Sequence, residues 1–426
     1  MPSSNSFSGG QLRLAATMVL VFVAIWLACA SQAAAVEHTR TLPRGRFNLN
    51  LRSVATDIAH KTGSSGAREG LAAPLERDLT FNDVLRNQGA LSAVRAAKVE
   101  GFMLANDFAR EDSLGNFSAS AKASVRATAP VLAYGVTDRF TVAAGAPYIN
   151  ARSAISVAFT RSGTAGDFIA RLSDPANNQL EAALELEQKL SDAPAELNRE
   201  LVNYGVAPLG EWQGSGWGDT TLATKWRAWE SGPLSFAATA GHVLATGAPD
   251  DPRIMTDVPF GDGQADSFIQ GTAAQEFVRG MTVSETVKYT YQHQGRREVF
   301  RGMDPDDLEA GTVMARFKPG DRIDAALGCM WSHSTGLNAA AGWQVSRKWS
   351  DRYYDGDDGS RLEKLEAGTD QTLHVAELVA GFSTVEGFLR GDYFAPAEVS
   401  LAVQRQVASR NAMESDLYEM SASLFF

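Results

Sequence analysis

Hydrophobic and polar residues alternate along several long segments of the chain. In residues 118–129 every odd position holds alanine or valine, and every even position holds serine, threonine, lysine or arginine. A period of two places one set on each face of a β-strand, which a helix could not do. Residues 281–294 repeat the alternation, with Glu285 interrupting the apolar face, and 46–52 and 418–426 follow it as well. The pattern predicts an all-β chain.

The small side chains on the apolar faces favour a membrane barrel over a soluble sandwich. Rows of alanine would fill a sandwich core poorly, whereas lipid adapts to them. Segments of ten or more residues match a tilted membrane crossing. Aromatic residues lie near the expected strand ends, as in the girdles of outer-membrane barrels: Tyr134, Tyr148, Trp217, Trp229, Trp331 and Trp349. We therefore expect a transmembrane antiparallel up-and-down β-barrel in which the odd face of 118–129, with Ala123, contacts lipid.

Twelve strands account for the segments between turn signals. They are expected at 96–110, 117–134, 139–152, 216–230, 234–246, 266–279, 281–294, 321–333, 337–349, 371–384, 396–407 and 414–426. Fourteen is the close alternative, if 46–55 and 312–318 also join the barrel. In such barrels short turns face the periplasm and long loops face outward, so an even count places both chain ends in the periplasm.

Two segments have helical rather than strand character. Residues 80–94 begin with Thr80 as a helix cap and Asp83 in the capping-box position. Residues 178–204 carry an apolar stripe interrupted by Pro194, which predicts two short amphipathic helices. The second segment falls in the longest expected outer loop, 153–215. Whether that loop forms a lid or inward plug, or a solvated cap, is left open by the sequence.

The N-terminal segment predicts export. Arg13 precedes fifteen uncharged residues, 14–28, and small residues lead to an Ala-Ala-Ala site at 33–35, as in a secretory signal peptide. An uncleaved anchor and lipidation at Cys29 are the alternatives. We expect a signal peptide over 1–35 read by the general secretory pathway, an N-terminal strand and short amphipathic helix over 36–95, and the barrel over 96–426.

Composition narrows the possible partners and cofactors. The formal net charge is −11, so nucleic acid is not an expected partner, since such binders usually present a basic face. Hydrophobic residues make up 44% of the chain, yet 14–28 is the one long apolar run, so a helical membrane bundle is excluded. Cleavage after residue 35 would leave Cys329 alone, without an intramolecular disulfide. No spacing calls for a cofactor.

Two short motifs carry a resemblance to known proteins. Tyr418, Leu424 and the terminal Phe426 resemble the signal that outer-membrane barrels present to the barrel assembly machinery. Residues 134–141, Tyr-Gly-Val-Thr-Asp-Arg-Phe-Thr, followed by Pro147-Tyr148, resemble a hairpin of the putative MetA-pathway-of-phenol-degradation family of outer-membrane proteins. This resemblance implies a channel for small hydrophobic or aromatic compounds in a Gram-negative outer membrane.

The polar faces of the expected strands supply candidate pore-lining residues. Basic residues predominate, and a strip of positive charge inside a barrel selects for anions. The alternative is that these charges form ion pairs that fill the interior without a passenger. The candidates are Lys122, Arg126, Asp219, Lys225, Arg227 and Lys288.

The sequence favours a channel or porin-like transporter for small molecules over two alternatives. A non-conducting structural or surface-binding barrel would use its outer loops. An outer-membrane enzyme would need a nucleophile, a base and an orienting group that converge, and no spacing among the six histidines supplies them. No metal-ligand spacing appears either. The expected partners are outer-membrane lipids, lipopolysaccharide, the assembly machinery and a small solute.

Overall fold

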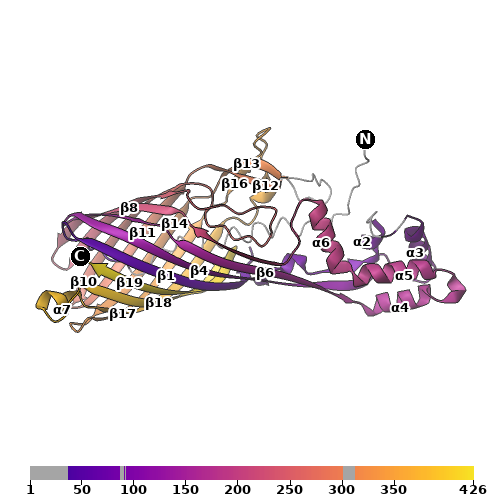
Figure 1. The fold of residues 1–426 in the computed structure, drawn as a ribbon, viewed down its shortest axis with the longest axis horizontal. Coiled ribbons are helices and arrows are strands. Elements are labelled where there is room, and N and C mark those ends of the chain that lie inside the picture. Colours follow the sequence, from indigo (N-terminus) through magenta and orange to yellow (C-terminus); the bar gives the residue numbers. More distant parts are fainter. Residues whose placement is uncertain (1–36, 87–90, 92, 301–311) are drawn as a thin grey trace.

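The computed structural model describes residues 37–426 except 87–90, 92 and 301–311. Within these residues twelve antiparallel strands form a closed barrel, because β1 pairs with both β19 and β4 (Figure 1). In barrel order the strands are β1 (Phe47–Thr62), β19 (Ala412–Phe425), β18 (Ala397–Arg410), β17 (Gln371–Ser383), β15 (Leu337–Lys348), β14 (Arg322–Ser332), β11 (Met281–Gln292), β10 (Asp266–Val278), β9 (Leu234–Leu244), β8 (Thr220–Ser231), β5 (Phe140–Gly145) and β4 (Ser113–Thr137).

The remaining elements lie outside the closed wall. Four strands extend the same sheet: β2 (Arg68–Gly70) pairs with β1, β3 (Arg77–Thr80) and β6 (Tyr148–Arg161) pair with β4, and β7 (Glu211–Trp217) pairs with β6. Three form a separate sheet: β12 (Gly295–Phe300), β13 (Thr312–Lys318) and β16 (Arg352–Tyr354). The helices are α2 (Phe81–Arg86), α3 (Ala93–Ala105), α4 (Gly163–Leu172), α5 (Leu180–Ser191), α6 (Ala193–Asn203) and α7 (Val385–Arg390), with 3-10 turns η1 (Ala73–Leu75), η2 (Pro175–Asn177) and η3 (Glu363–Leu365).

The predicted count of twelve strands is confirmed, but one predicted strand is wrong and another, 139–152, is divided between β5 and β6. The segment 96–110 lies mostly in helix α3, because Val99 and Met103, one helical turn apart, are both fully buried. Strand β1 takes its place in the wall, so the strand expected within 36–95 closes the barrel. Segment 312–318 of the fourteen-strand alternative is β13, which pairs with β12 and β16 away from the barrel.

The two ends of the barrel differ in their connections. At one end, the turn end, residues 138–139, 232–233 and 279–280 make tight turns, and both Phe47 and Phe426 lie there. At the opposite end, the loop end, lie the connections 162–210, 245–265 and 349–370. At the same end a tight turn at Asn411, a residue in the left-handed conformation, joins β18 to β19.

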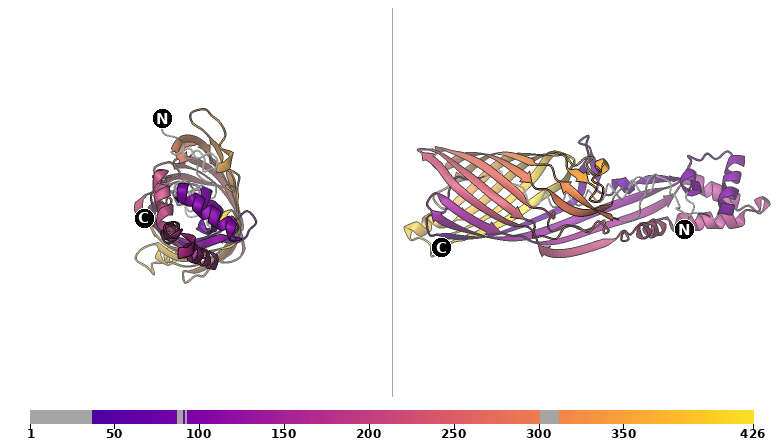
Figure 2. Two further views of the ribbon diagram at one scale, coloured as in Figure 1. Left: turned by 90° about the vertical axis from the view of Figure 1, so that its right-hand side faces the viewer. Right: turned by 90° about the horizontal axis from the view of Figure 1, so that it is seen from above.

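Strand β4 extends well beyond the barrel at the loop end. Its 25 residues pair with β1 over 123–134, while residues 115–128 pair with β6. Helices α2, α3, α4 and α5 cover this extension and form the helical cap (Figures 1 and 2). Phe81, Phe168 and Leu186 are fully buried in the cap's core. These helices therefore form a cap on the extension and do not plug the barrel.

The predicted helices within 178–204 are confirmed. Helix α5 ends at Ser191 and α6 begins at Ala193, so Pro194 stands in the first turn of α6, where its missing amide hydrogen costs nothing. Among the described residues, no helix has both the length and the apolar character that a membrane span requires.

The capping box at the start of α2 is formed as predicted. The Thr80 amide donates to Asp83 Oδ2 at 2.9 Å, and the Asp83 amide donates to Thr80 Oγ1 at 3.3 Å. Replacing Thr80 with alanine should therefore destabilise the start of α2 by about 1 kcal/mol. Hydrogen exchange at the Asp83 amide should accelerate accordingly. Unchanged exchange would show that packing of Phe81, and not the cap, holds this turn.

Large apolar side chains cover the outside of the barrel. On β11 the odd residues other than the half-buried Val283 are exposed and the even ones are buried or half-buried, and on β19 Tyr418 to Phe426 alternate as predicted. Exposed aromatic residues lie near the strand ends on both sides of this apolar surface, which we call the belt: Tyr148, Trp217, Trp229, Trp331 and Trp349. Tyr134 is half-buried against Phe47, with ring centroids 4.6 Å apart.

The predicted orientation of β4 is wrong. Ala123 is only 4% exposed and packs in an interior cluster with Val125 and Ile58, so it cannot contact lipid. The even face points outward instead. That face is polar from 118 to 128 and becomes apolar at Pro130 and Leu132. The polar part therefore belongs to the extension, where the outside meets water and the apolar face packs inward.

Candidate functional site: the barrel lumen

The lumen contains a cavity of about 350 Å³ with two unlike walls. One wall is mainly apolar, interrupted by Arg52, Asp219 and Thr221, and comes mainly from β4, β5, β6, β8 and β9. It consists of Val125, Ala127, Ala129, Val131, Ala143, Ile149, Ala223 and Val243. Small side chains at these inward positions leave room near the wall, so an apolar solute could lie flat against it.

The opposite wall is polar and comes from β10, β11 and β14. Its lining residues are Asp266, Phe268, Lys288, Thr290 and Arg322. The Lys288 ammonium lies 4.5 Å from the centre of the Phe268 ring, a cation–π contact. Arg322 pairs with Asp324 at 3.0 Å. Thr290 Oγ1 is buried and has no hydrogen-bond partner in the described part of the chain. This wall thus offers charge and hydrogen bonding to a solute.

The β9–β10 loop, residues 245–265, folds into the loop end of the barrel. Met255 and Val258 are buried in the interior cluster, and Val258 and Pro259 line the cavity. Ser153 on β6 donates to the Thr256 carbonyl, and the Ala207 amide donates to the Arg253 carbonyl at 2.6 Å. This loop narrows the lumen from above, and Leu201 and Val206 of the segment 153–215 belong to the same buried cluster.

Asp219 fixes the base of that loop. Its Oδ1 accepts from the Gly247 amide at 2.8 Å, while its Oδ2 is buried without a partner among the described residues. The backbone passes so closely here that a Cβ at Gly247 would lie 2.5 Å from the Phe260 carbonyl oxygen. Asp219 therefore lies at the edge of the cavity, and its hydrogen bond is with the loop.

Asp262 makes the closed loop sensitive to pH. Burial, reinforced by the nearby charge of Asp266, raises its pKa to about 7. A raised carboxyl pKa means that the folded loop retains a proton that the open loop releases above about pH 4. Closure should therefore weaken progressively between pH 4 and 7, by about 1 kcal/mol for each pH unit. Protease cleavage within 245–265 should be faster at pH 8 than at pH 5. Asp262→Asn should remove this difference, and a difference that persists in the variant would assign the effect to another group.

The segment 37–43, which we call the N-terminal plug, lies in the lumen near the turn end. Lys225 Nζ donates to the His38 carbonyl and lies 3.6 Å from Glu37 Oε2. The Thr39 and Ser235 hydroxyls are 2.6 Å apart, and the Leu42 amide donates to Thr141 Oγ1 at 2.9 Å. Lys225, Ser235 and Thr141 all belong to inward-facing series of their strands. The plug therefore occupies the exit below the cavity.

The structure separates the predicted pore-lining residues into three groups. Lys122 and Arg126 are exposed on the outer face of the β4 extension, a correction that follows from the reversed orientation of β4. Asp219 and Lys288 line the cavity. Lys225 and Arg227 point inward at the turn end, where Arg227 donates to the Asp138 carbonyl at 3.0 Å. A role in passage for any of them stays a prediction.

The polar wall was only partly predicted. Phe268 and Asp266 lie directly across from Thr290 and Gln292 in the β10–β11 pairing, so both could have been found by extending the polar face of 281–294 to its neighbour. The residues of the loop 245–265 gave no such signal, since they show neither period two nor period 3.6.

The terminal residues lie where the predicted assembly signal requires them. Tyr418, Leu424 and Phe426 are exposed on the outer face, and the Phe426 ring stacks on Phe47 with centroids 5.6 Å apart. This stacking closes the seam between the first and last strands. Recognition by an assembly machinery stays a prediction.

No protein-family model and no curated protein sequence matches the chain. Among solved structures, an outer-membrane channel from Pseudomonas putida F1 matches over 92% of this chain and all of its own, with 13% identity and a TM-score of 0.50. The barrel has the fold of an outer-membrane channel. At this identity the likeness establishes the fold alone. A toluene transporter from Ralstonia pickettii matches over 93% of this chain and 94% of its own, with 11% identity and a TM-score of 0.34. Membership of the MetA-pathway family stays a prediction.

Proposed function

We propose that this chain is an outer-membrane channel that passes small hydrophobic or aromatic compounds. The main support for this proposal is the lumen cavity with its apolar wall and its polar wall. An aromatic ring fits against Ala127 and Val131 on the apolar wall, while a hydroxyl or carboxyl group on the same compound reaches Lys288 or Thr290 on the polar wall. A purely ionic solute would leave the apolar wall unused. The displacement of Lys122 and Arg126 to the outer face also removes part of the basic strip that favoured small anions.

The surface and the connections of the barrel support the proposed location and orientation. Its apolar belt with aromatic residues at both margins supports insertion in an outer membrane. The long connections and the helical cap then face the exterior, and the turn end faces the periplasm. Export by the general secretory pathway rests on residues 1–35, which lie outside the described residues, as does Cys29.

The test is single-channel recording in planar bilayers with protein that lacks residues 37–43. Discrete conductance is expected, interrupted by benzyl alcohol but not by glucose, which lacks an apolar face. Ala127→Trp, which places an indole against the apolar wall, should abolish the interruptions, whereas Ser120→Trp on the outer face of the extension should preserve them. Interruption by glucose to the same extent would overturn the selectivity.

A second function has one observation in its favour. The N-terminal plug and the loop 245–265 obstruct the lumen from both ends, as a non-conducting surface-binding barrel would require. Silence in the bilayer even after removal of residues 37–43 and opening of the loop by Asp219→Ala would favour this alternative over the channel.

A further inference from the structure

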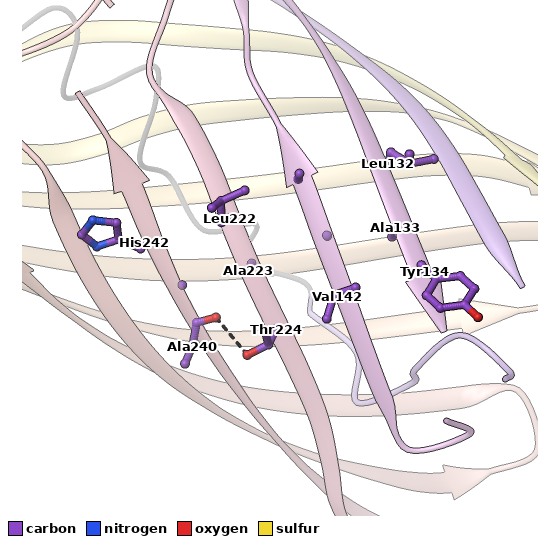
Figure 3. Close-up of a pocket in the computed structure, with 12 residues that line it drawn as sticks. Leu132, Ala133, Tyr134, Val142, Leu222, Ala223, Thr224, Ala240 and His242 are labelled. Atoms are coloured by element: carbon purple, nitrogen blue, oxygen red, sulfur yellow. Dashed lines mark hydrogen bonds between the residues drawn. The ribbon is translucent and has the colours of Figure 1, made fainter. Parts of the chain in front are cut away.

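A groove runs across the outer wall of the barrel, between β4 and β9. It has a volume of about 640 Å³. Figure 3 shows the side chains that border it, from Leu132 and Tyr134 on β4 to His242 on β9. Its floor consists of small residues, among them Ala144, Ala240 and Gly241. Leu132 and Leu222 are exposed, and their strand neighbours Val131 and Ala223 line the lumen, so the groove faces away from the lumen.

The groove crosses the apolar belt from one margin to the other. At the turn end it begins at Tyr134, beside Phe47. At the loop end it reaches His242, which pairs across the sheet with Ser267 on β10. Ser267 in turn lies opposite the exposed Tyr291 on β11, so this end of the groove is level with tyrosines of the aromatic margin. The groove therefore has the position and the lining expected of a site for an acyl chain.

A polar cluster stands at the loop end of the groove. His242 Nδ1 and His293 Nε2 each lie 2.9 Å from Ser267 Oγ. The two imidazole rings are 5.8 Å apart, and Tyr291 packs edge-on against His293 with centroids 4.8 Å apart. In the part of the chain that the structure describes, His242 Nε2 and His293 Nδ1 make no hydrogen bond, so one nitrogen of each ring remains to contact a ligand.

The hydroxyl at the centre allows both imidazoles to become donors. Ser267 Oγ has two lone pairs and can accept from Nδ1–H of His242 and Nε2–H of His293 together. When both rings are protonated, their remaining nitrogens also carry hydrogens. An anion with several acceptor oxygens would favour that state and receive two charge-assisted hydrogen bonds. Lys318, which lies 4.2 Å above the Tyr291 ring, is already paired with Asp321 at 2.6 Å and adds little net charge.

We propose that the groove and the His242–Ser267–His293 cluster bind one phosphorylated lipid from the leaflet at the loop end. The phosphate contacts the two imidazoles, and an acyl chain occupies the groove over Ala240. In the orientation of the proposed function this leaflet is the outer one, and its phosphorylated lipid is the lipid A part of lipopolysaccharide. Binding needs no open lumen, so it stands apart from any transport.

Native mass spectrometry of the purified, delipidated barrel tests the proposal. The probes are bis-phosphorylated lipid A, the same lipid without its phosphates, and inorganic phosphate. One lipid A per chain is expected to remain bound, while inorganic phosphate alone does not bind. Loss of the lipid phosphates, or replacement of both histidines by glutamine (His242→Gln with His293→Gln), should weaken binding at least about tenfold. Ala240→Trp should weaken binding of both lipids by filling the groove.

Matched variants separate this site from general lipid contact. His333→Gln removes a histidine at the opposite end of the barrel, and Ala273→Trp adds an indole to the outer face of β10, outside the groove. Both should bind lipid A like the unmodified protein, and retained heat-modifiable gel mobility shows that every variant is folded. Equal binding by all variants would overturn the proposal. So would uptake of one zinc ion per chain that depends on both histidines and excludes lipid, since it would make the cluster a metal site.

Discussion

Leu401→Arg should destabilise the barrel by about 2–4 kcal/mol, because it places a charge in the lipid-facing belt near mid-depth. Leu401 on β18 is 62% exposed, and its neighbours across the two pairings are Ala380 and Met420. None of these groups can pair with a guanidinium. Equilibrium unfolding in phospholipid vesicles, followed by tryptophan fluorescence, measures the change in the free energy of unfolding.

The adjacent residue provides a control at the same depth. Ser400 belongs to the inward series of β18, so Ser400→Arg directs the charge into the lumen and should change stability by less than about 1 kcal/mol. On β4 the even residues face outward, which is the reverse of the sequence-based expectation, so a matched pair of variants there would have its faces exchanged. Similar losses for the two β18 variants would reject the assigned faces of that strand.

Fixing the N-terminal plug to the wall should hold the channel closed. The Thr39 and Ser235 hydroxyls are 2.6 Å apart, so cysteines at both positions are well placed for a disulfide. In a Cys329→Ser background, the oxidised Thr39→Cys and Ser235→Cys variant should show no conductance, and a reductant should restore it. We expect a complete loss of conductance, because the crosslink prevents the plug from leaving the lumen.

Each single cysteine variant controls for the substitutions themselves. Both singles should conduct as the parent does under oxidising and reducing conditions. Conductance that survives complete crosslinking, judged by mass, would show that solutes pass beside the plug. In that case the obstruction would have to be assigned to the loop 245–265.

Sequence alternation predicted the strands best where one face meets lipid. On β11 and β19 the apolar residues face outward as expected. Tyr289 and Tyr418, for example, lie in the belt. The capping box at Thr80 and the break at Pro194 were also predictable, since both depend on local backbone chemistry. These features need no knowledge of distant contacts.

The orientation of β4 was missed because an apolar face does not show what covers it, whether lipid or other side chains. Ala123 faces a packed interior, although the row of small apolar residues around it has the same pattern as a row that faces lipid. The loop residues Met255 and Val258 lie at the mouth because they contact residues that are distant in sequence. No local pattern in the sequence therefore predicts their position. The sequence-based prediction of a strand over 96–110 is wrong for a different reason: Val99 and Met103 have the spacing of one helical turn.

The length of β4 has a consequence for how a solute reaches the lumen. Its 25 residues span about 80 Å, whereas the hydrocarbon core of a membrane is about 30 Å thick. The outward face becomes polar at Thr128, so β4 and its partner β6 continue far into the aqueous side as an arm on one side of the mouth (Figure 1). A compound dissolved in the membrane cannot follow the lipid surface along this arm. On this side of the barrel it must first enter the surrounding water.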